Sequence, residues 1–289
     1  MIGGRDASLT AQAVPDPTVC CRIKEGDKVN VDVTAPGATL ALGLMFMRTN
    51  SKSVAARLDL PDTNFTLQYV RPDLVLLRML ARSLIMWDEI EPSKEWVESR
   101  MPKIVREAVV TKSGGLRATE GDVPEGEAAG ASLFTDQDSL RHLNANIVAG
   151  CCLAIGLRFA GSGEKLAMDL LMGYLRHFVN LRRHACDGVR KVDRQLMENC
   201  ISLLAISASL VMAGTGNVDL LRVLRTLRER VEPDLHYGHH MAIGMAMGFL
   251  FLGGGRATLC TSNEAIAALV IALYPRFPIS TTDCRYPIP

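Results

Sequence analysis

The sequence predicts an all-α protein, built as an α-solenoid of two-helix repeats. Apolar side chains recur at three- and four-residue spacing through most of residues 34–289, which is the pattern of helices with one buried face. Aromatic residues make up only 5% of the chain, so Leu, Ala, Met, Val and Ile must fill the interior, and these side chains favour closely packed helices. Small residues return at an interval of about forty residues, the length of a two-helix solenoid unit.

The first 33 residues form a polar lead-in with scattered Pro and Gly. Residues Lys28–Val33 alternate between polar and apolar side chains, which predicts at most a single short strand. The helical-repeat domain is expected over residues 34–289. Its first helix should start at Pro36, because proline favours the first position of a helix, and should end near Thr49. A short helix is expected next, over Ser51–Leu58.

A second pair of helices is expected over residues 73–89 and 93–109. The first follows Pro72 and has an apolar face at three- and four-residue spacing, formed by Leu74, Leu77, Leu80, Ala81, Leu84 and Ile85. The second should be capped at its N-terminus by Ser93. Pro102 should kink or split it, because a proline inside a helix removes one backbone hydrogen bond.

Residues 111–136 interrupt the helical pattern. They are rich in Gly, Glu, Ser and Ala and contain few large apolar side chains. A segment of this composition buries too little apolar surface to offset the entropy lost on ordering. The sequence therefore predicts a flexible insertion within the repeat domain.

Helical periodicity resumes at Gln137. Further helices are expected over residues 137–159, 164–183, 190–213, 218–231, 236–252 and 263–274. The tail over residues 275–289 contains four prolines, so it should not continue as a regular element.

Three of these helices end on matching glycine steps, at residues 160–163, 213–216 and 252–255. Aligning the steps without gaps places a small residue at one equivalent position of each apolar helix. These positions are Gly43, Gly156, Ser209 and Gly248. If Ser83 is the corresponding residue of the second helix, the intervals along the series are 40, 73, 53 and 39 residues. The interval of 73 contains the insertion, and it falls to 47 when those 26 residues are removed.

Glycine inside a helix costs about 1 kcal/mol relative to alanine, so a stripe of glycines needs a compensating interaction. Close contact between two helix backbones supplies one, because removing side chains allows dense packing. We therefore predict that the stripe packs neighbouring repeats together through Gly37, Gly43, Gly150, Gly156, Ser209 and Gly248.

Charge and cysteine content exclude several classes of function. Lys and Arg total 32 against 31 Asp and Glu, and this balance disfavours a nucleic-acid partner. No two of the eight cysteines are separated by two residues, the gap that is typical of zinc and redox motifs, so such a motif is disfavoured. A reducing compartment is therefore expected. Residues 199–218 and 235–255 approach the length of a membrane span, but polar residues and glycine breaks shorten both, so no membrane contact is expected.

Other residues suggest an alternative, a helical ligand- or metal-binding domain or an enzyme. His236, His239 and His240 include a pair at four-residue spacing that could bind a metal, but a third ligand is lacking, and the same histidines suit the first turn of a helix. Gly253–Gly255 could hold a phosphate, but its spacing fits a glycine helix stop better than a nucleotide motif.

Cys151 and Cys152 could act as nucleophiles, but their apolar helix favours core packing. No catalytic residue and no cofactor are therefore predicted. Arg222, Arg225, Arg228 and Arg230 could contact an acidic partner, but a solvated face of an outer helix explains them better.

Six stretches across residues 31–286 resemble the proteasome/cyclosome-repeat region of the large scaffold subunits of the anaphase-promoting complex, an E3 ubiquitin ligase. These stretches are Ala35–Gly43, Arg71–Leu74, Gly156–Gly161, Phe251–Arg256, Ala272–Pro275 and Ser280–Tyr286. The large non-ATPase subunits of the proteasome share the repeat type but not these longer strings.

The resemblance implies a curved or partly toroidal solenoid that organises other subunits of the ligase in cell-cycle control and has no catalytic role of its own. It also implies particular partners, namely the cullin subunit, the DOC-homology subunit and the coactivator. The expected location is the nucleus and cytoplasm.

Overall fold

The computed structural model of the chain describes residues 24–25, 28–62, 70, 72–106, 137–184, 191–232 and 235–283. Helices dominate this part of the chain, and the sheet described there is one short hairpin, in which β1 (Lys24–Glu25) pairs antiparallel with β2 (Lys28–Val29). The prediction of an all-α protein is confirmed. The predicted insertion at 111–136 lies outside the described residues.

The first helix begins earlier than predicted. Helix α1 spans Val31–Met45 and contains Pro36 in its interior instead of at its first position. The strand is correspondingly shorter, because residues that alternate in the sequence after Val29 already belong to the helix. Pro72 does occupy the predicted position at the start of helix α4, which spans Pro72–Ile85.

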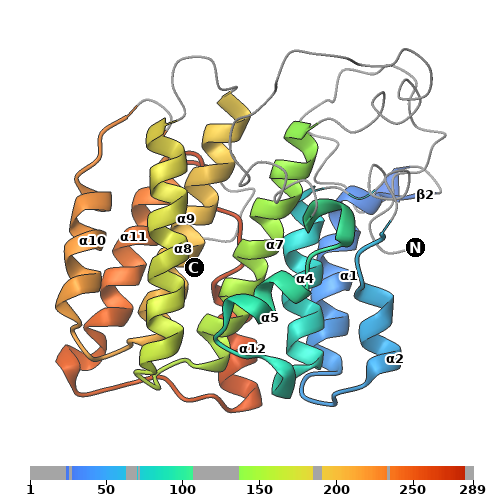
Figure 1. Cartoon of the computed structure of the whole chain (residues 1–289), viewed down its shortest axis with the longest axis horizontal. Helices are drawn as coiled ribbons and strands as arrows, with labels where there is room; N and C mark the ends of the chain where they lie inside the picture. The colour runs from blue at the N-terminus through green and yellow to red at the C-terminus, as the bar shows by residue number, and fades with distance from the viewer. Residues whose placement is uncertain are drawn as a thin grey trace, which may run out of the picture.

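Five helices form one layer in the order in which they occur along the chain. They are α1, α4, α7 (Gln137–Arg158), α9 (Lys191–Val211) and α11 (Tyr237–Leu250). Each packs against the next, and Figure 1 shows them side by side. These are the helices for which the sequence predicts a small-residue stripe. We call them the inner layer.

A second set of helices covers this layer, and we call it the outer layer. It contains α2 (Lys52–Ala55) with the 3₁₀ helix η3 (Ala56–Leu58), α5 (Lys94–Ser99), α8 (Lys165–His184) and α10 (Val218–Arg228). Each follows one inner helix in the chain and contacts the next one, as α8 contacts α9 and α10 contacts α11. Each two-helix unit is therefore tied to its successor through both layers.

Local sequence signals explain where the outer helices begin and end. The Ser93 hydroxyl accepts a hydrogen bond from the Trp96 amide at 3.1 Å and so caps α5, as predicted. Asn217 caps α10 in the same way, through the Leu220 amide at 3.0 Å. The helix α5 ends at Ser99, and Pro102 separates it from a further helical turn at residues 103–106, so the predicted split is confirmed.

The C-terminal part does not continue this alternation. A strap over residues 257–261 crosses the ends of α9 and α7, where the Thr258 hydroxyl donates to the carbonyl oxygens of Ala213 at 3.2 Å and Gly161 at 3.1 Å. The strap leads into α12 (Asn263–Ala272), and the tail then returns to the start of α11, where the Gly238 amide donates to the Pro278 carbonyl at 2.8 Å.

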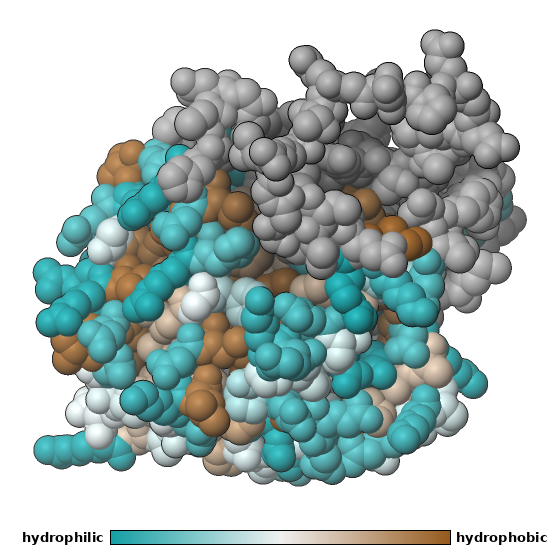
Figure 2. All heavy atoms as spheres, in the orientation of Figure 1, coloured by the Kyte–Doolittle hydropathy of each residue, from teal (hydrophilic) through white to brown (hydrophobic). Residues whose placement is uncertain are grey.

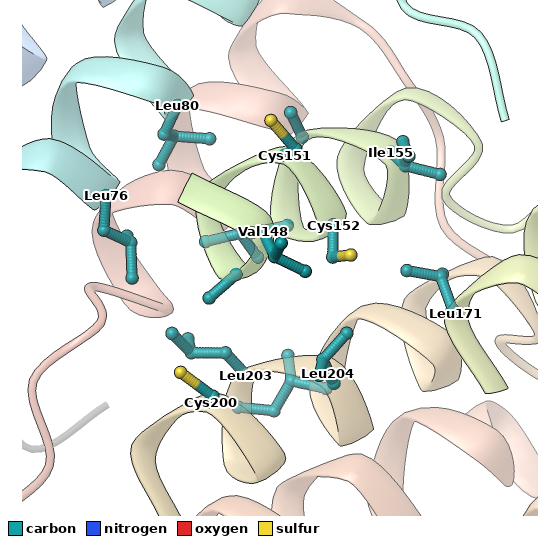
Figure 3. Close-up of a cluster of buried hydrophobic side chains, with 14 of the residues drawn as sticks. Leu76, Leu80, Val148, Cys151, Cys152, Ile155, Leu171, Cys200, Leu203 and Leu204 are labelled. Atoms are coloured by element: carbon teal, nitrogen blue, oxygen red, sulfur yellow. The ribbon is translucent and has the colours of Figure 1, made fainter. Parts of the chain in front are cut away.

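The core runs through the middle of the inner layer. Figure 3 shows Leu80 of α4, Cys152 of α7 and Leu204 of α9 pointing into one apolar cluster, which Leu171 of α8 joins. Among the described residues, one helical segment, Ser139–Arg158, is long and apolar enough to cross a membrane, and 78% of its most apolar part is buried inside the protein. It lies in α7, whose contacts with α4 and α9 account for its apolar composition.

Candidate functional site

The turns that close three of the inner helices, α1, α7 and α9, share an unusual backbone conformation. Positive φ angles occur at Gly161 and Gly163 after α7 and at Gly214 and Gly216 after α9. They also occur after α1 at two non-glycine residues, Arg48 (φ 60°) and Asn50 (φ 50°). Arg48 and Asn50 lie five and seven positions after Gly43, as Gly161 and Gly163 lie after Gly156. The conformation therefore belongs to the repeat and not to the glycine residues alone.

Each of the turns after α1, α7 and α9 donates two backbone hydrogen bonds to the end of the next inner helix. The six bonds have N–O distances between 2.8 and 3.0 Å, and they are Arg48→Leu84, Asn50→Ile85, Gly161→Leu210, Gly163→Val211, Gly214→Phe249 and Gly216→Leu250. The last four carbonyl groups of a helix have no amide donor within the helix itself. The neighbouring turn satisfies two of them, so backbone bonds fix the register between successive repeats.

Close contact between backbones accompanies this register at three of the predicted glycines. A Cβ added at Gly43 would lie 2.8 Å from the Cα of Ala81, and one at Gly156 would lie 2.8 Å from the Cα of Ser207. A Cβ at Gly150 would lie 2.7 Å from the carbonyl oxygen of Leu76. Distances under 3 Å force a neighbour to move, so these positions admit no side chain without rearrangement.

Two predicted glycines do not make such contacts. A Cβ at Gly37 or at Gly248 would meet nothing within 4 Å, and both residues are exposed. Gly248 lies on α11, where no described inner helix covers the side that bears it, so the assignment of close packing to these two positions is wrong for the structure described. Ser209 is fully buried in α9, and its hydroxyl has no hydrogen-bond partner among the described residues.

The histidine group forms the N-terminal cap of α11. The Nδ1 atom of His239 accepts a hydrogen bond from the His236 amide at 3.2 Å, and its Nε2 lies 2.9 Å from the Asn199 side-chain oxygen. Burial, followed by the charges of His236, Arg230 and His240, lowers the pKa of His239 to about 4. His240 points to solvent. Both ring nitrogens of His239 are thus engaged in structure, and no group of three metal-binding side chains occurs within the described ranges.

The glycines at 253–255 terminate α11 with three positive φ angles, of 59°, 64° and 79°. They lie next to the strap, and a Cβ added at Gly214 would fall 1.9 Å from the Ala257 carbonyl oxygen. This geometry agrees with the helix-stop interpretation. The strap contacts were missed by the sequence reasoning, because no local pattern in residues 257–261 indicates which helix ends they cross.

The two cysteines considered as nucleophiles are fully buried. Burial raises the pKa of Cys151 to about 12, and it raises the pKa of Cys152 as well. Thiols with a raised pKa stay protonated and unreactive near neutral pH, so the geometry supports their role in the core.

A buried charge cluster joins the two layers and was also missed. Glu198 of α9 has no exposed side-chain surface, and both its oxygens accept hydrogen bonds from the Arg230 guanidinium at 2.8 Å. Arg182 of α8 also pairs with Glu198, and it pairs with Glu232. Burial alone would lower the pKa of Arg182, but the two carboxylates raise it above its usual value. The only sequence signal was a lone carboxylate on an otherwise apolar stretch of helix.

The remaining arginines of the predicted run have different surroundings. Arg222 pairs with Asp219 at 3.2 Å, with both side chains 76% exposed, while Arg225 and Arg228 are exposed on the same helix. Of this run, Arg230 is the residue that enters the buried cluster.

Comparison with known proteins identifies the family of this arrangement. The family model described as the APC1 fifth domain matches residues 2–288. Anaphase-promoting complex subunit 1 of Dictyostelium discoideum is 42% identical over 278 residues, which cover 91% of this chain and 12% of that relative. The human protein of the same name is 42% identical over 265 residues, covering 92% and 13%. A protein of Emericella nidulans named Negative regulator of mitosis is 42% identical over 254 residues, covering 88% and 11%.

The chain thus spans about an eighth of the length of its first relatives. The family match covers nearly every residue, from the lead-in to the C-terminal tail. It includes the closing turns and the three closely packed glycines. The chain belongs to the APC1 fifth-domain family.

Proposed function

We propose that this chain is a scaffold region of an anaphase-promoting complex, a cell-cycle ubiquitin ligase, and that it organises other subunits without taking part in ubiquitin transfer. The relatives are named as subunit 1 of that complex or as a regulator of mitosis. The observation that carries the proposal is the repeated backbone register of the inner layer. Six hydrogen bonds of one kind join α1 to α4, α7 to α9 and α9 to α11 in fixed positions, and such fixed positions are the property that a platform for other proteins requires.

The proposed partners are the cullin subunit, the DOC-homology subunit and the coactivator, and the proposed location is the nucleus and cytoplasm. The test is to express the full-length subunit with a tag in cells and to identify the proteins that purify with it. Recovery of the cullin and DOC-homology subunits in fixed proportion is expected. Deleting residues 31–283 should reduce that recovery, and an unchanged subunit composition would contradict a scaffold role for this region.

The absence of a catalytic role is tested separately. Cys260 is exposed, whereas Cys151, Cys152 and Cys200 are buried, so Cys260 is the described thiol that could accept ubiquitin. The chain is incubated with E1, E2 and ubiquitin, and thioester formation is followed on non-reducing gels. We expect no ubiquitin on the chain and no effect of Cys260→Ser in the assembled ligase. A thioester that disappears with Cys260→Ser would show that the region takes part in transfer.

A further inference from the structure

The outer layer contains a groove between α8 and α10 that the scaffold proposal does not use. Its volume is about 370 Å³. The apolar part of its lining comes from Leu175 and Val179 of α8 and from Val223 and Leu227 of α10. Figure 2 shows hydrophobic residues lying between hydrophilic ones on the side of the molecule that carries these helices.

The polar part of the lining is predominantly cationic. Four guanidinium groups line the groove, from Arg176, Arg182, Arg183 and Arg230, and among the described lining residues Glu232 is the one that carries a carboxylate. Glu198 lies beneath the groove with no exposed surface. Positive charge therefore exceeds negative charge in the groove, even though the whole chain carries a formal net charge of only +1.

These arginines fall into two classes. Arg182 and Arg230 are held in place by Glu198, with only 11% and 17% of their side chains exposed. Arg176 and Arg183 are exposed, and neither forms an ion pair or hydrogen bond with any other described residue. The first pair braces the walls of the groove, and the second pair is left to interact with a molecule outside the fold.

We propose that this groove docks an acidic segment of a partner protein, with carboxylates on Arg176 and Arg183 and apolar side chains between α8 and α10. Guanidinium groups bind carboxylates through charge-assisted hydrogen bonds, often two at once. The apolar floor explains why the ligand is a peptide and not a bare polyanion. The described residues of the lining include no aromatic side chain on which a nucleic-acid base could stack. The proposal extends the scaffold function by naming the chemistry of one partner at one surface.

The test uses the 289-residue chain and a fluorescein-labelled helical peptide with glutamate on one side and leucine on the other, followed by fluorescence anisotropy. The groove variant is Arg176→Glu with Arg183→Glu, and the matched control is Arg225→Glu with Arg228→Glu, which reverses two exposed arginines of α10 outside the groove. We expect binding to weaken about tenfold or more in the groove variant and by less than about twofold in the control. Both variants should melt like the unmodified chain, because all four side chains are exposed.

Two further arms separate the peptide from other occupants. Replacing the leucines of the peptide by serine should weaken binding, and raising the salt concentration should weaken it further, because exposed charges are screened. An oligo-dT strand should bind more weakly than the peptide. Deleting residues 111–136, which contain Glu120, Asp122, Glu125 and Glu127, should leave the affinity for the peptide unchanged.

The proposal is overturned by any of four results. They are no saturable binding below about 1 mM, equal weakening in the groove and control variants, equal or tighter binding of oligo-dT, and a marked gain in affinity on deleting 111–136. The last result would make the acidic segment of this chain the occupant. The two proposals fail separately. An unchanged subunit composition after deletion of this region would contradict the scaffold proposal, whereas the anisotropy measurements test the groove alone.

Discussion

The inner and outer layers of this molecule are held together by different interactions. Between inner helices, small residues bring the backbones together and closing turns donate to carbonyl groups of the next helix. The outer helices instead present one apolar face and one charged face, as in α8, where Leu171 and Leu175 are buried and Arg176 is exposed. Sequence changes in the inner layer must therefore respect backbone geometry. In the outer layer they need only respect the pattern of apolar and polar side chains, except where Glu198 joins the layers.

That junction should give the largest single effect. Replacing Glu198 by alanine leaves Arg230 mostly buried without its carboxylate partner and leaves Arg182 with Glu232 as its one carboxylate. Breaking a buried ion pair from one side typically costs about 3–5 kcal/mol. We expect a loss of that order in the free energy of unfolding, measured by urea denaturation of the chain.

The control for Glu198 is Asp219→Ala, which removes an ion pair of the same type at the surface. Asp219 and Arg222 are each 76% exposed, and such pairs contribute about 0–1 kcal/mol. Similar losses in the two variants would show that the buried position of Glu198 contributes nothing beyond an ordinary surface contact.

The histidine cap of α11 should make stability depend on pH. The pKa of His239 is about 4 in the folded protein, below the value near 6.5 of an unfolded chain, so protonation favours unfolding. The contribution is fully present above pH 6.5 and is lost as the pH falls toward 4. It amounts to about 3 kcal/mol, taking 1.36 kcal/mol for each pKa unit.

Carboxylates also titrate in this window, so the measurement must isolate His239. We compare the unmodified chain with His239→Gln and His240→Gln by urea denaturation at several pH values. The decline between pH 6.5 and 4 should be smaller in His239→Gln and unchanged in His240→Gln, because His240 is exposed. Parallel profiles for all three proteins would mean that His239 is protonated equally well in the folded and unfolded states.

The same substitution at two equivalent positions should have opposite effects in the inner layer. Gly156→Ala places a Cβ 2.8 Å from the Cα of Ser207 and should cost about 1–3 kcal/mol through overpacking. Gly248→Ala meets nothing within 4 Å and should instead stabilise α11 by up to about 1 kcal/mol through helix propensity. Thermal melting of the two variants gives the sign directly. A stabilising effect at both positions would show that the Gly156 contact can relax freely.

Much of the inner layer was predictable from the sequence, because its signals are local. The glycine steps at 160–163 and 213–216 mark the closing turns, and the spacing of apolar residues marks the helices to within a few positions. The long-range features were not predictable. Glu198 of α9 pairs with Arg182 of α8 and with Arg230, which follows α10, and no local pattern reveals that pairing.

The exposed position of Gly248 illustrates the same limit. Its sequence context matches that of Gly156, and only the three-dimensional arrangement shows that a helix covers one and not the other. The early start of α1 is a different case, because Pro36 indicated a first helical position and the helix instead accommodates it in its interior. The sequence therefore specifies which residues can pack closely, while their neighbours decide which of them do.

The smallest effect concerns the closing turns, and it tests whether they need glycine or only a positive φ angle. Gly163 has φ 65°, and a Cβ added there meets nothing within 4 Å, so backbone strain is the one cost of a side chain. Alanine at this φ should cost about 1 kcal/mol. Asparagine tolerates the left-handed region better, and the equivalent turn after α1 already carries Asn50 at φ 50°. We therefore expect Gly163→Asn to lower the melting temperature less than Gly163→Ala, with both variants keeping the amide that donates to Val211 at 2.9 Å. Equal losses would mean that Asn50 is accommodated by its own hydrogen bond to Asp88, at 2.6 Å, and not by a general tolerance of the repeat for asparagine.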